Sequence, residues 1–104
     1  MNDEVLQHIT DTIVQKFHPR RIILFGSRAR GEAQPDSDYD VLVEMETELP
    51  FHARMTSMYR AFGLRQLPMD VLVFTPDEMT EERSKVYSVA KIAEREGKVL
   101  YDAP

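Results

Sequence analysis

GSRARGEAQPDSDYDVLV, residues 26–43, is the stretch of sequence that decides the fold. It links two short apolar runs, RIILF at 21–25 and DYDVLV at 38–43. The first run is rich in β-branched residues and is typical of a strand in a sheet that is covered on both faces. The second run alternates, as a strand does. The stretch therefore predicts two strands joined by a tight connection.

The connection itself carries turn and helix signals. Gly26 and Ser27 end the first strand, and Ser27 is expected to cap a short helix that runs through Arg30. Gly31 would terminate that helix, because glycine readily adopts the left-handed conformation that often follows a helix. Residues 32–37, EAQPDS, have the composition of a turn.

Outside this stretch, hydrophobic spacing and capping residues predict the remaining elements. Two strands are expected, one over 69–74 and a short edge strand over 98–101. One helix is expected over 3–17 behind an Asn2/Asp3 cap, and another follows Pro50. A third helix starts with a capping box at Thr75, breaks near Glu82 and ends at Gly97. We therefore predict an α/β (α+β) fold, a small mixed sheet flanked by helices, with residues 1–104 forming a single domain.

Composition limits the classes of function. The 104 residues are 42% hydrophobic and 30% charged, and no apolar run approaches the roughly 20 residues that span a membrane. The N-terminus lacks the pattern of a secretory signal, so a cytoplasmic location is expected. A net charge of −5 argues against direct nucleic-acid binding through the phosphates, but leaves room for a local basic patch. Without cysteine, any metal needs oxygen or imidazole ligands, and hard cations are the first expectation.

Carboxylates concentrate in the two later strands. Asp38 and Asp40 are two residues apart, so their side chains are expected on the same face of a strand. Neighbouring carboxylates repel one another unless a cation neutralises them, and Mg²⁺ accepts one or two carboxylates together with water and phosphate oxygens. Asp70 adds a third charge at the start of an apolar strand. If that strand lies beside 38–43, Asp70 would complete a two-metal site or assist proton removal from an acceptor.

Gly26 and Ser27 are the candidate phosphate-binding residues. A strand followed by glycine, serine and a helix lets the backbone approach a phosphate closely and presents N–H groups and a hydroxyl to it. Phosphoryl transfer depends mostly on positioning and charge stabilisation, so three aspartates and such a loop would suffice without a nucleophilic side chain. The simpler interpretation is a tight turn, a helix cap and solvated aspartates. The joint occurrence of all five residues favours the site.

The motif resembles that of a known superfamily. Gly26 and Ser27, ten intervening residues and then Asp38 and Asp40 match the G-S-x10-D-x-D signature of the DNA polymerase beta nucleotidyltransferase superfamily, and Asp70 matches its third acidic residue on a later strand. The resemblance covers nearly the whole chain. The GSRARG opening and the short chain look like the minimal nucleotidyltransferases (MNT), many of which are the antitoxin half of HEPN/MNT toxin–antitoxin pairs.

This resemblance implies a polymerase-beta-like nucleotidyltransferase fold and a magnesium-dependent enzyme. Such antitoxins are associated with transfer of AMP from ATP to a tyrosine of the HEPN toxin, which silences it. The implied roles are nucleotide binding at Gly26 and Ser27, coordination of Mg²⁺, with two ions expected, by Asp38, Asp40 and Asp70, and catalysis by the same three aspartates.

The acceptor is expected to come from a partner protein. Polymerases and nucleotide-adding enzymes of the superfamily use extra domains to hold a primer, an RNA end or an antibiotic, and none is expected here. A region around Met55, Met58 and Tyr59, or the C-terminal YDAP, is a candidate contact, although a methionine-rich stripe more often packs in the core. The alternative is a catalytically idle module that neutralises its partner by occlusion. Adenylylation of a small molecule such as an aminoglycoside is less expected.

Two arginines leave the sequence interpretation open. Arg28 and Arg30 either neutralise phosphates or pair with Glu32 and Asp36, and the sequence favours neither reading.

Overall fold

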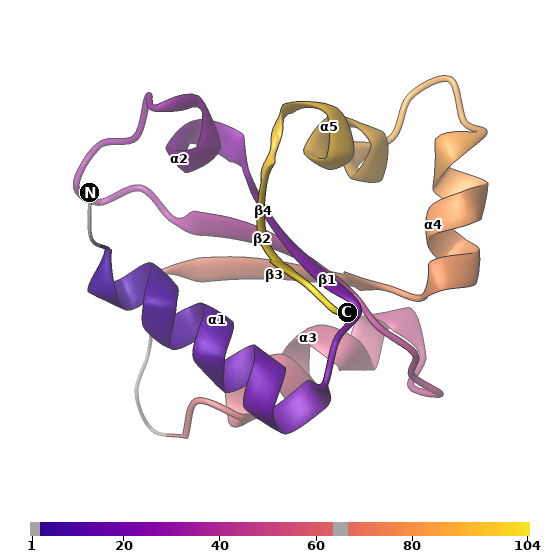
Figure 1. Ribbon diagram of the computed structural model, residues 1–104, viewed down its shortest axis with the longest axis horizontal. Helices are drawn as coiled ribbons and strands as arrows, with labels where there is room; N and C mark the ends of the chain where they lie inside the picture. The colour runs from indigo at the N-terminus through magenta and orange to yellow at the C-terminus, as the bar shows by residue number, and fades with distance from the viewer. Residues whose placement is uncertain (1–2, 64–66) are drawn as a thin grey trace.

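A mixed sheet of four strands forms the centre of the computed structural model, which describes residues 3–63 and 67–104 (Figure 1). In chain order the elements are α1 (Glu4–Phe17), β1 (Arg21–Phe25), α2 (Gly26–Arg30), β2 (Tyr39–Glu44), α3 (Phe51–Arg60), β3 (Met69–Phe74), α4 (Pro76–Arg83), α5 (Val89–Glu96) and β4 (Lys98–Asp102). The strand order is β3-β2-β1-β4. The predicted α/β class, with helices flanking a small mixed sheet, is confirmed.

β1 runs opposite to the other three strands of the sheet. β1 pairs antiparallel with both β2 and β4, whereas β2 and β3 run parallel. The parallel pair requires a crossover, which includes α3. Its register sets Tyr39 opposite Met69 and Asp40 opposite Asp70. β3 and β4 are the outer strands of the described sheet.

Helices cover both faces of the sheet. Figure 1 shows α1 and α3 on one side of it, and α2, α4 and α5 on the other. The larger core cluster joins α1 and α3 to one face, and its fully buried members include Ile9, Ile13, Ile22, Val41, Val43, Met58 and Val71. A smaller cluster on the other face consists of Ile23, Leu42, Met79, Ala90 and Ala93. Because side chains alternate along a strand, residues 40 and 70 lie on the face of this smaller cluster.

Helix boundaries match the predictions with one exception at α2. The helix follows Phe25 directly, and no side chain caps it, so the predicted cap at Ser27 is wrong. Gly26 has a positive φ of 73° and turns the chain straight out of β1, which leaves Ser27 inside the helix. Gly31 ends α2 in the left-handed conformation, as predicted.

The other caps and breaks agree with the sequence. Asp3 caps α1 by accepting from the Leu6 N–H at 3.0 Å, whereas the predicted contribution of Asn2 lies outside the described residues. Thr75 forms the predicted capping box with Glu78. The predicted break near Glu82 is the gap between α4 and α5, and the predicted edge strand is β4.

Two predictions on position need correction. β2 starts at Tyr39, one residue later than predicted, so Asp38 precedes the strand. The ladder begins where the Tyr39 N–H donates to the Pro68 carbonyl at 2.7 Å. Met58 is 1% exposed and belongs to the core, so the docking role considered for it is wrong.

No helix in the described part of the chain is both long and apolar enough to cross a membrane.

Arg54 is a buried charge that joins three segments. Its side chain donates to the Leu49 carbonyl at 2.9 Å, to the Val73 carbonyl at 3.0 Å and to a Glu78 carboxylate oxygen at 2.6 Å. Arg54 is 7% exposed. The hydrogen bond from Arg54 is the main cause that lowers the pKa of Glu78 below its ordinary value of 4.5. The pair therefore fixes α3 to the start of α4.

Arg54→Met is expected to lower the free energy of unfolding by about 3 kcal/mol, because it leaves two carbonyls and a carboxylate without their donor. Urea unfolding measures this loss. The lowered pKa of Glu78 means that the pair stabilises the fold above pH 4.5 and that this contribution disappears as pH falls through the folded-state pKa. The difference between mutant and wild type should therefore narrow in acid. Arg30→Met, which breaks the exposed Arg30–Glu32 pair, is the control and should lower the free energy of unfolding far less. Equal losses in the two variants would contradict the assignment.

Candidate active site

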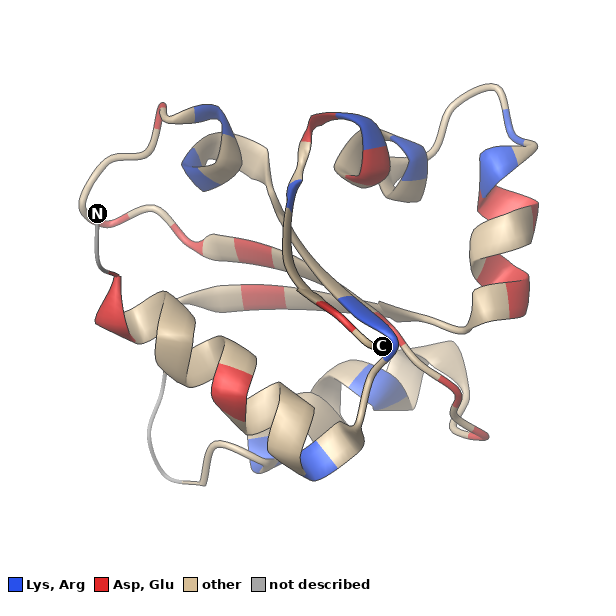
Figure 2. Cartoon of the chain, in the orientation of Figure 1, with Lys and Arg blue, Asp and Glu red and all other residues tan. Residues whose placement is uncertain are grey.

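Asp40 and Asp70 lie directly opposite one another on neighbouring strands. They are register partners in the parallel ladder of β2 and β3. Strands in a sheet are about 4.8 Å apart, and partners in a ladder project from the same face, so the two carboxylates are neighbours. Figure 2 shows the acidic segments of β2 and β3 side by side. The condition on which the metal-site prediction depended, a strand 69–74 beside 38–43, is therefore met.

The carboxylates of this site repel one another. Burial is the largest cause that raises the pKa of Asp40 above its ordinary value of 3.8, and the negative charges of Asp70 and Asp38 raise it further. The positive charge of Arg30 acts in the opposite direction. A bound cation would relieve this repulsion, as would a proton on Asp40.

Gly26 touches the carboxylate of Asp40. A Cβ atom placed on Gly26 would lie 2.1 Å from Asp40 Oδ2 and 3.1 Å from its Cγ. The φ of 73° at Gly26 is a second reason for glycine here, since other residues rarely adopt it. The predicted phosphate loop and the predicted metal ligands are thus in direct contact.

Ser27 follows as the second residue of α2 and is partly exposed. Within the described part of the chain its hydroxyl makes no hydrogen bond, while its carbonyl accepts from the Glu32 N–H at 2.9 Å. The hydroxyl is therefore available to a ligand beside Gly26.

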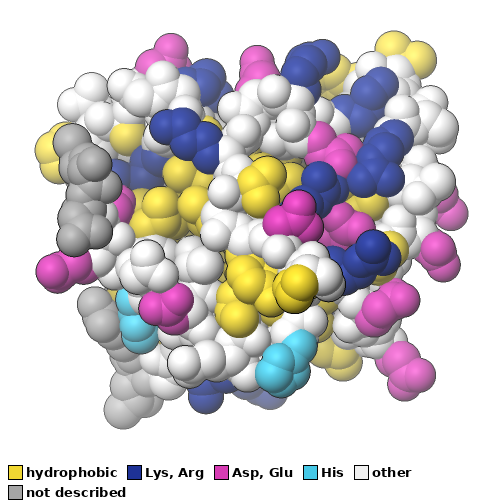
Figure 3. All heavy atoms as spheres, in the orientation of Figure 1, with side chains coloured by type: hydrophobic (Ala, Val, Ile, Leu, Met, Phe, Trp, Pro, Cys, Tyr) yellow, Lys and Arg dark blue, Asp and Glu magenta, His cyan; other side chains and the backbone are white. Residues whose placement is uncertain are grey.

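Charges of both signs lie on the same side of the sheet. Lys and Arg side chains lie over α2, α4 and α5 in the face shown in Figure 3, with Asp and Glu side chains among them. The basic side chains include Arg28 and Arg30 of α2 and Arg95 of α5. Several of the cations on these helices form ion pairs, among them Arg30 with Glu32 and Arg83 with Glu94.

Asp38 and Asp70 are both exposed, whereas Asp40 is half-buried. Asp38 precedes β2 rather than belonging to the strand. Its charge still contributes to the raised pKa of Asp40. Across residues 3–63 and 67–104, no three acidic, histidine or cysteine side chains converge closely enough to hold one ion together. Mg²⁺ needs only one or two carboxylates, completed by water and substrate oxygens, so the Asp40 and Asp70 pair fits such an ion.

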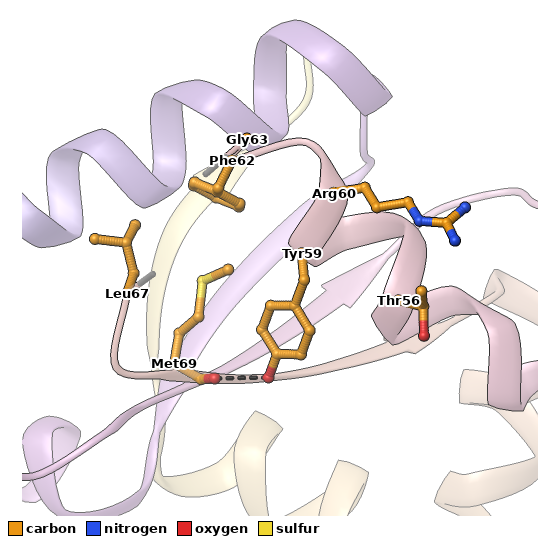
Figure 4. A pocket seen from close by; sticks show the side chains of 7 residues that line it. All are labelled: Thr56, Tyr59, Arg60, Phe62, Gly63, Leu67 and Met69. Atoms are coloured by element: carbon orange, nitrogen blue, oxygen red, sulfur yellow. Dashed lines mark hydrogen bonds between the residues drawn. The ribbon is translucent and has the colours of Figure 1, made fainter. Parts of the chain in front are cut away.

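Tyr59 holds the backbone beside Asp70, a function that the sequence analysis missed. Its hydroxyl donates to the Met69 carbonyl at 2.7 Å (Figure 4). The Pro68 carbonyl faces β2, so the next carbonyl, that of Met69, faces away from the ladder at the outer edge of β3. Burial and the charges of Asp70 and Asp38 raise the pKa of the Tyr59 hydroxyl, which keeps it a donor. A tyrosine within an apolar helical stripe is the signal, because its hydroxyl needs a partner.

Figure 4 also shows the pocket of about 540 Å³ that Tyr59 lines together with residues of α3 and β3. Met69 lines it from the sheet and belongs to the core cluster of α1 and α3. The pocket therefore lies on the face opposite Asp40 and Asp70.

Tyr59→Phe is expected to lower the free energy of unfolding by about 1 kcal/mol, the usual net worth of one hydrogen bond. Any catalytic rate should fall modestly, because the backbone of Asp70 loses one anchor and not its place in the ladder. Chemical denaturation and a rate measurement on the same preparation check both values. A fully inactive but stable variant would show instead that the hydroxyl takes part in the chemistry.

Known proteins share the fold described above. Residues 6–102 match the family model of the nucleotidyltransferase domain. Among solved structures, the chain is similar to a proposed nucleotidyltransferase from Sulfolobus solfataricus, with a TM-score of 0.66 and 22% identity over 95% of this chain and 78% of that chain. It is also similar to a toxin–antitoxin structure with AMP-PNP, with a TM-score of 0.60 and 20% identity over 93% of this chain and 73% of that chain. At such identities the likeness concerns the fold. No curated protein matches the sequence.

Proposed function

The chain belongs to the nucleotidyltransferase domain family, and we propose from this premise that it transfers AMP from ATP, with Mg²⁺, to a tyrosine hydroxyl of a HEPN toxin and so acts as an antitoxin. The observation that carries the proposal is the direct contact of Gly26 with Asp40, which faces Asp70 across the ladder. The residues that we propose as phosphate loop, metal ligands and carboxylate base are thus adjacent.

Gly26 and Ser27 bind the triphosphate in this proposal. The positive φ of Gly26 brings the backbone close to the ligand, and the Ser27 hydroxyl donates to a phosphate oxygen.

Asp38, Asp40 and Asp70 are the proposed metal ligands. Asp40 and Asp70 have the chemistry and the adjacency that a hard cation requires, and Asp38 is an exposed carboxylate two residues before Asp40. When bound, Mg²⁺ supplies charge neutralisation on the triphosphate and on the departing pyrophosphate. Two ions are expected.

The transfer step is an in-line substitution at phosphorus. The acceptor oxygen forms a bond to the α-phosphorus, the bond from that phosphorus to the β-phosphate oxygen breaks, and pyrophosphate leaves with the electron pair. Asp70 accepts the hydroxyl proton of the acceptor. No covalent intermediate on the protein is needed.

The choice of a protein acceptor has separate support. A structural neighbour is a toxin–antitoxin assembly with an ATP analogue, at a TM-score of 0.60. Exposed apolar side chains on the described surface offer contacts for a partner, among them Phe51, Val86 and Tyr87.

The test is incubation of the chain with ATP labelled in the α-phosphate, Mg²⁺ and the protein encoded by the neighbouring gene. Label should appear on the partner, map to a tyrosine and disappear in Asp38→Ala and Asp40→Ala. Neutralisation of the partner by those variants without label would replace the enzyme by a module that acts through occlusion. Label on an aminoglycoside and none on protein would refute the choice of acceptor.

A further inference from the structure

Arg28 of α2 grips the turn that leads into β2. Its Nε and Nη2 groups donate to the Ser37 carbonyl at 3.1 and 2.8 Å, and Nη2 also reaches the Pro35 carbonyl at 3.4 Å. Both bonds to Ser37 end on one oxygen, that of the peptide group joining Ser37 to Asp38. The guanidinium thus holds the backbone immediately before the first aspartate of the D-x-D motif.

The turn that Arg28 holds is itself closed by hydrogen bonds. The Ser37 N–H donates to the Gln34 carbonyl at 3.0 Å, and the Gln34 N–H donates to the Ser37 hydroxyl at 2.8 Å. The hydrogen bonds from Arg28 to the Ser37 carbonyl therefore fix the whole turn relative to α2.

The residue after Asp38 is held by the same arginine. The Arg28 guanidinium lies 4.0 Å from the centroid of the Tyr39 ring, and Tyr39 is 5% exposed. The Tyr39 hydroxyl donates to Asp3 Oδ2 at 2.7 Å, and the other oxygen of Asp3 caps α1. Asp38 itself is exposed and lies outside the ladder, so its position depends on these two neighbours.

We propose that Arg28 is a positioning residue that sets Asp38 beside Asp40 by holding the Ser37–Asp38 peptide and the Tyr39 ring. The inference rests on the proposed function and deepens it, since it names what makes an exposed aspartate a defined ligand. It also decides one question that the sequence left open. Arg30 pairs with Glu32, whereas Arg28 binds backbone carbonyls and an aromatic ring rather than Asp36.

Geometry rather than charge makes arginine the fitting residue. Two N–H groups of the planar guanidinium donate to the Ser37 carbonyl while the guanidinium lies over the Tyr39 ring, and a lysine ammonium offers neither feature. Arg28→Lys therefore keeps the charge and removes the paired hydrogen bonds and the contact with the ring, whereas Arg28→Met removes the charge as well. Arg30→Met removes one charge from the same helix without touching the turn.

The first measurement is the backbone order of Asp38 by NMR relaxation of the free, ¹⁵N-labelled protein. In Arg28→Lys and Arg28→Met the order parameter at Asp38 should fall from the rigid value of about 0.85 toward 0.6 or less, with that of Asp40 unchanged. Arg30→Met should keep the wild-type value. Thermal unfolding confirms that each variant is folded, and the lysine variant remains informative if the methionine variant is not.

The second measurement is Mn²⁺ titration of the same samples, followed by paramagnetic broadening of the Asp38 and Asp40 amides. Loss of a residue that orients a ligand should weaken Mn²⁺ binding roughly 10-fold to 100-fold, and AMP transfer should lose kcat more than KM changes. Wild-type order at Asp38 in Arg28→Lys would overturn the positioning role alone. Absence of Mn²⁺ binding by the wild-type protein would instead refute the proposed site.

Discussion

Asp40→Asn is expected to slow nucleotidyl transfer severely while leaving the fold at least as stable as the wild type. A carboxylate that holds a catalytic metal contributes several kcal/mol of transition-state stabilisation, which corresponds to a loss of about 10² to 10⁴ in rate. The measurement is kcat/KM for AMP transfer beside the midpoint of thermal unfolding without metal.

The raised pKa of Asp40 explains why the Asp40→Asn variant should be no less stable than the wild type. Burial and the charges of Asp70 and Asp38 raise the pKa above 3.8, so the folded state binds the proton more tightly than the unfolded chain does. The contribution of Asp40 to stability is complete below pH 3.8 and is lost as pH rises through the folded-state pKa. At neutral pH the ionised side chain therefore weakens the fold, and asparagine removes that penalty. Mg²⁺ should stabilise the wild type and not the variant, and a variant that keeps its rate would contradict the metal role.

Gly26→Ala is expected to lower transfer by at least about 100-fold, because its Cβ would occupy the space of the Asp40 carboxylate at 2.1 Å. The variant also suffers backbone strain at a φ of 73°, at a cost of about 1–2 kcal/mol. Rates and unfolding free energies measured on one preparation separate the two effects.

Gly31→Ala is the matched control for this experiment. Gly31 has a φ of 75° and no atom within 4 Å of an added Cβ, so it shares the strain and lacks the collision. Both variants should lose stability through the strain, Gly26→Ala at least as much as Gly31→Ala, and only Gly26→Ala should lose activity. Comparable activity in the two variants would show that Gly26 serves the turn alone and that the Asp40 carboxylate can move without consequence.

Local patterns in the sequence were enough to predict the strands and most helix ends. RIILF and MDVLVF became β1 and β3 with the predicted limits, because a short β-branched run bounded by turn residues has few other structures open to it. The capping box at Thr75 likewise depends only on residues that are close together in the sequence.

Contacts between distant segments were beyond the sequence. The parallel pairing of β2 with β3 joins residues 30 apart, and only a conditional prediction of Asp70 beside Asp40 was possible. Arg28 could not be assigned, because its partners are carbonyls that every residue carries. The close approach of Gly26 to Asp40 was equally hidden, although the glycine and the aspartate were both chosen as site residues. Their assigned roles in nucleotide and metal binding stay predictions until the variants above are measured.

The parallel ladder that sets Asp40 against Asp70 also has a dynamic consequence. β3 is an outer strand, so a local opening at its first residues would separate the two carboxylates while the rest of the sheet stayed intact. A metal–nucleotide complex bound to both carboxylates would hold the start of β3 against β2. Amide exchange at the start of β3 should therefore slow when substrate binds, and enzymatic competence should disappear on warming before the molecule as a whole melts.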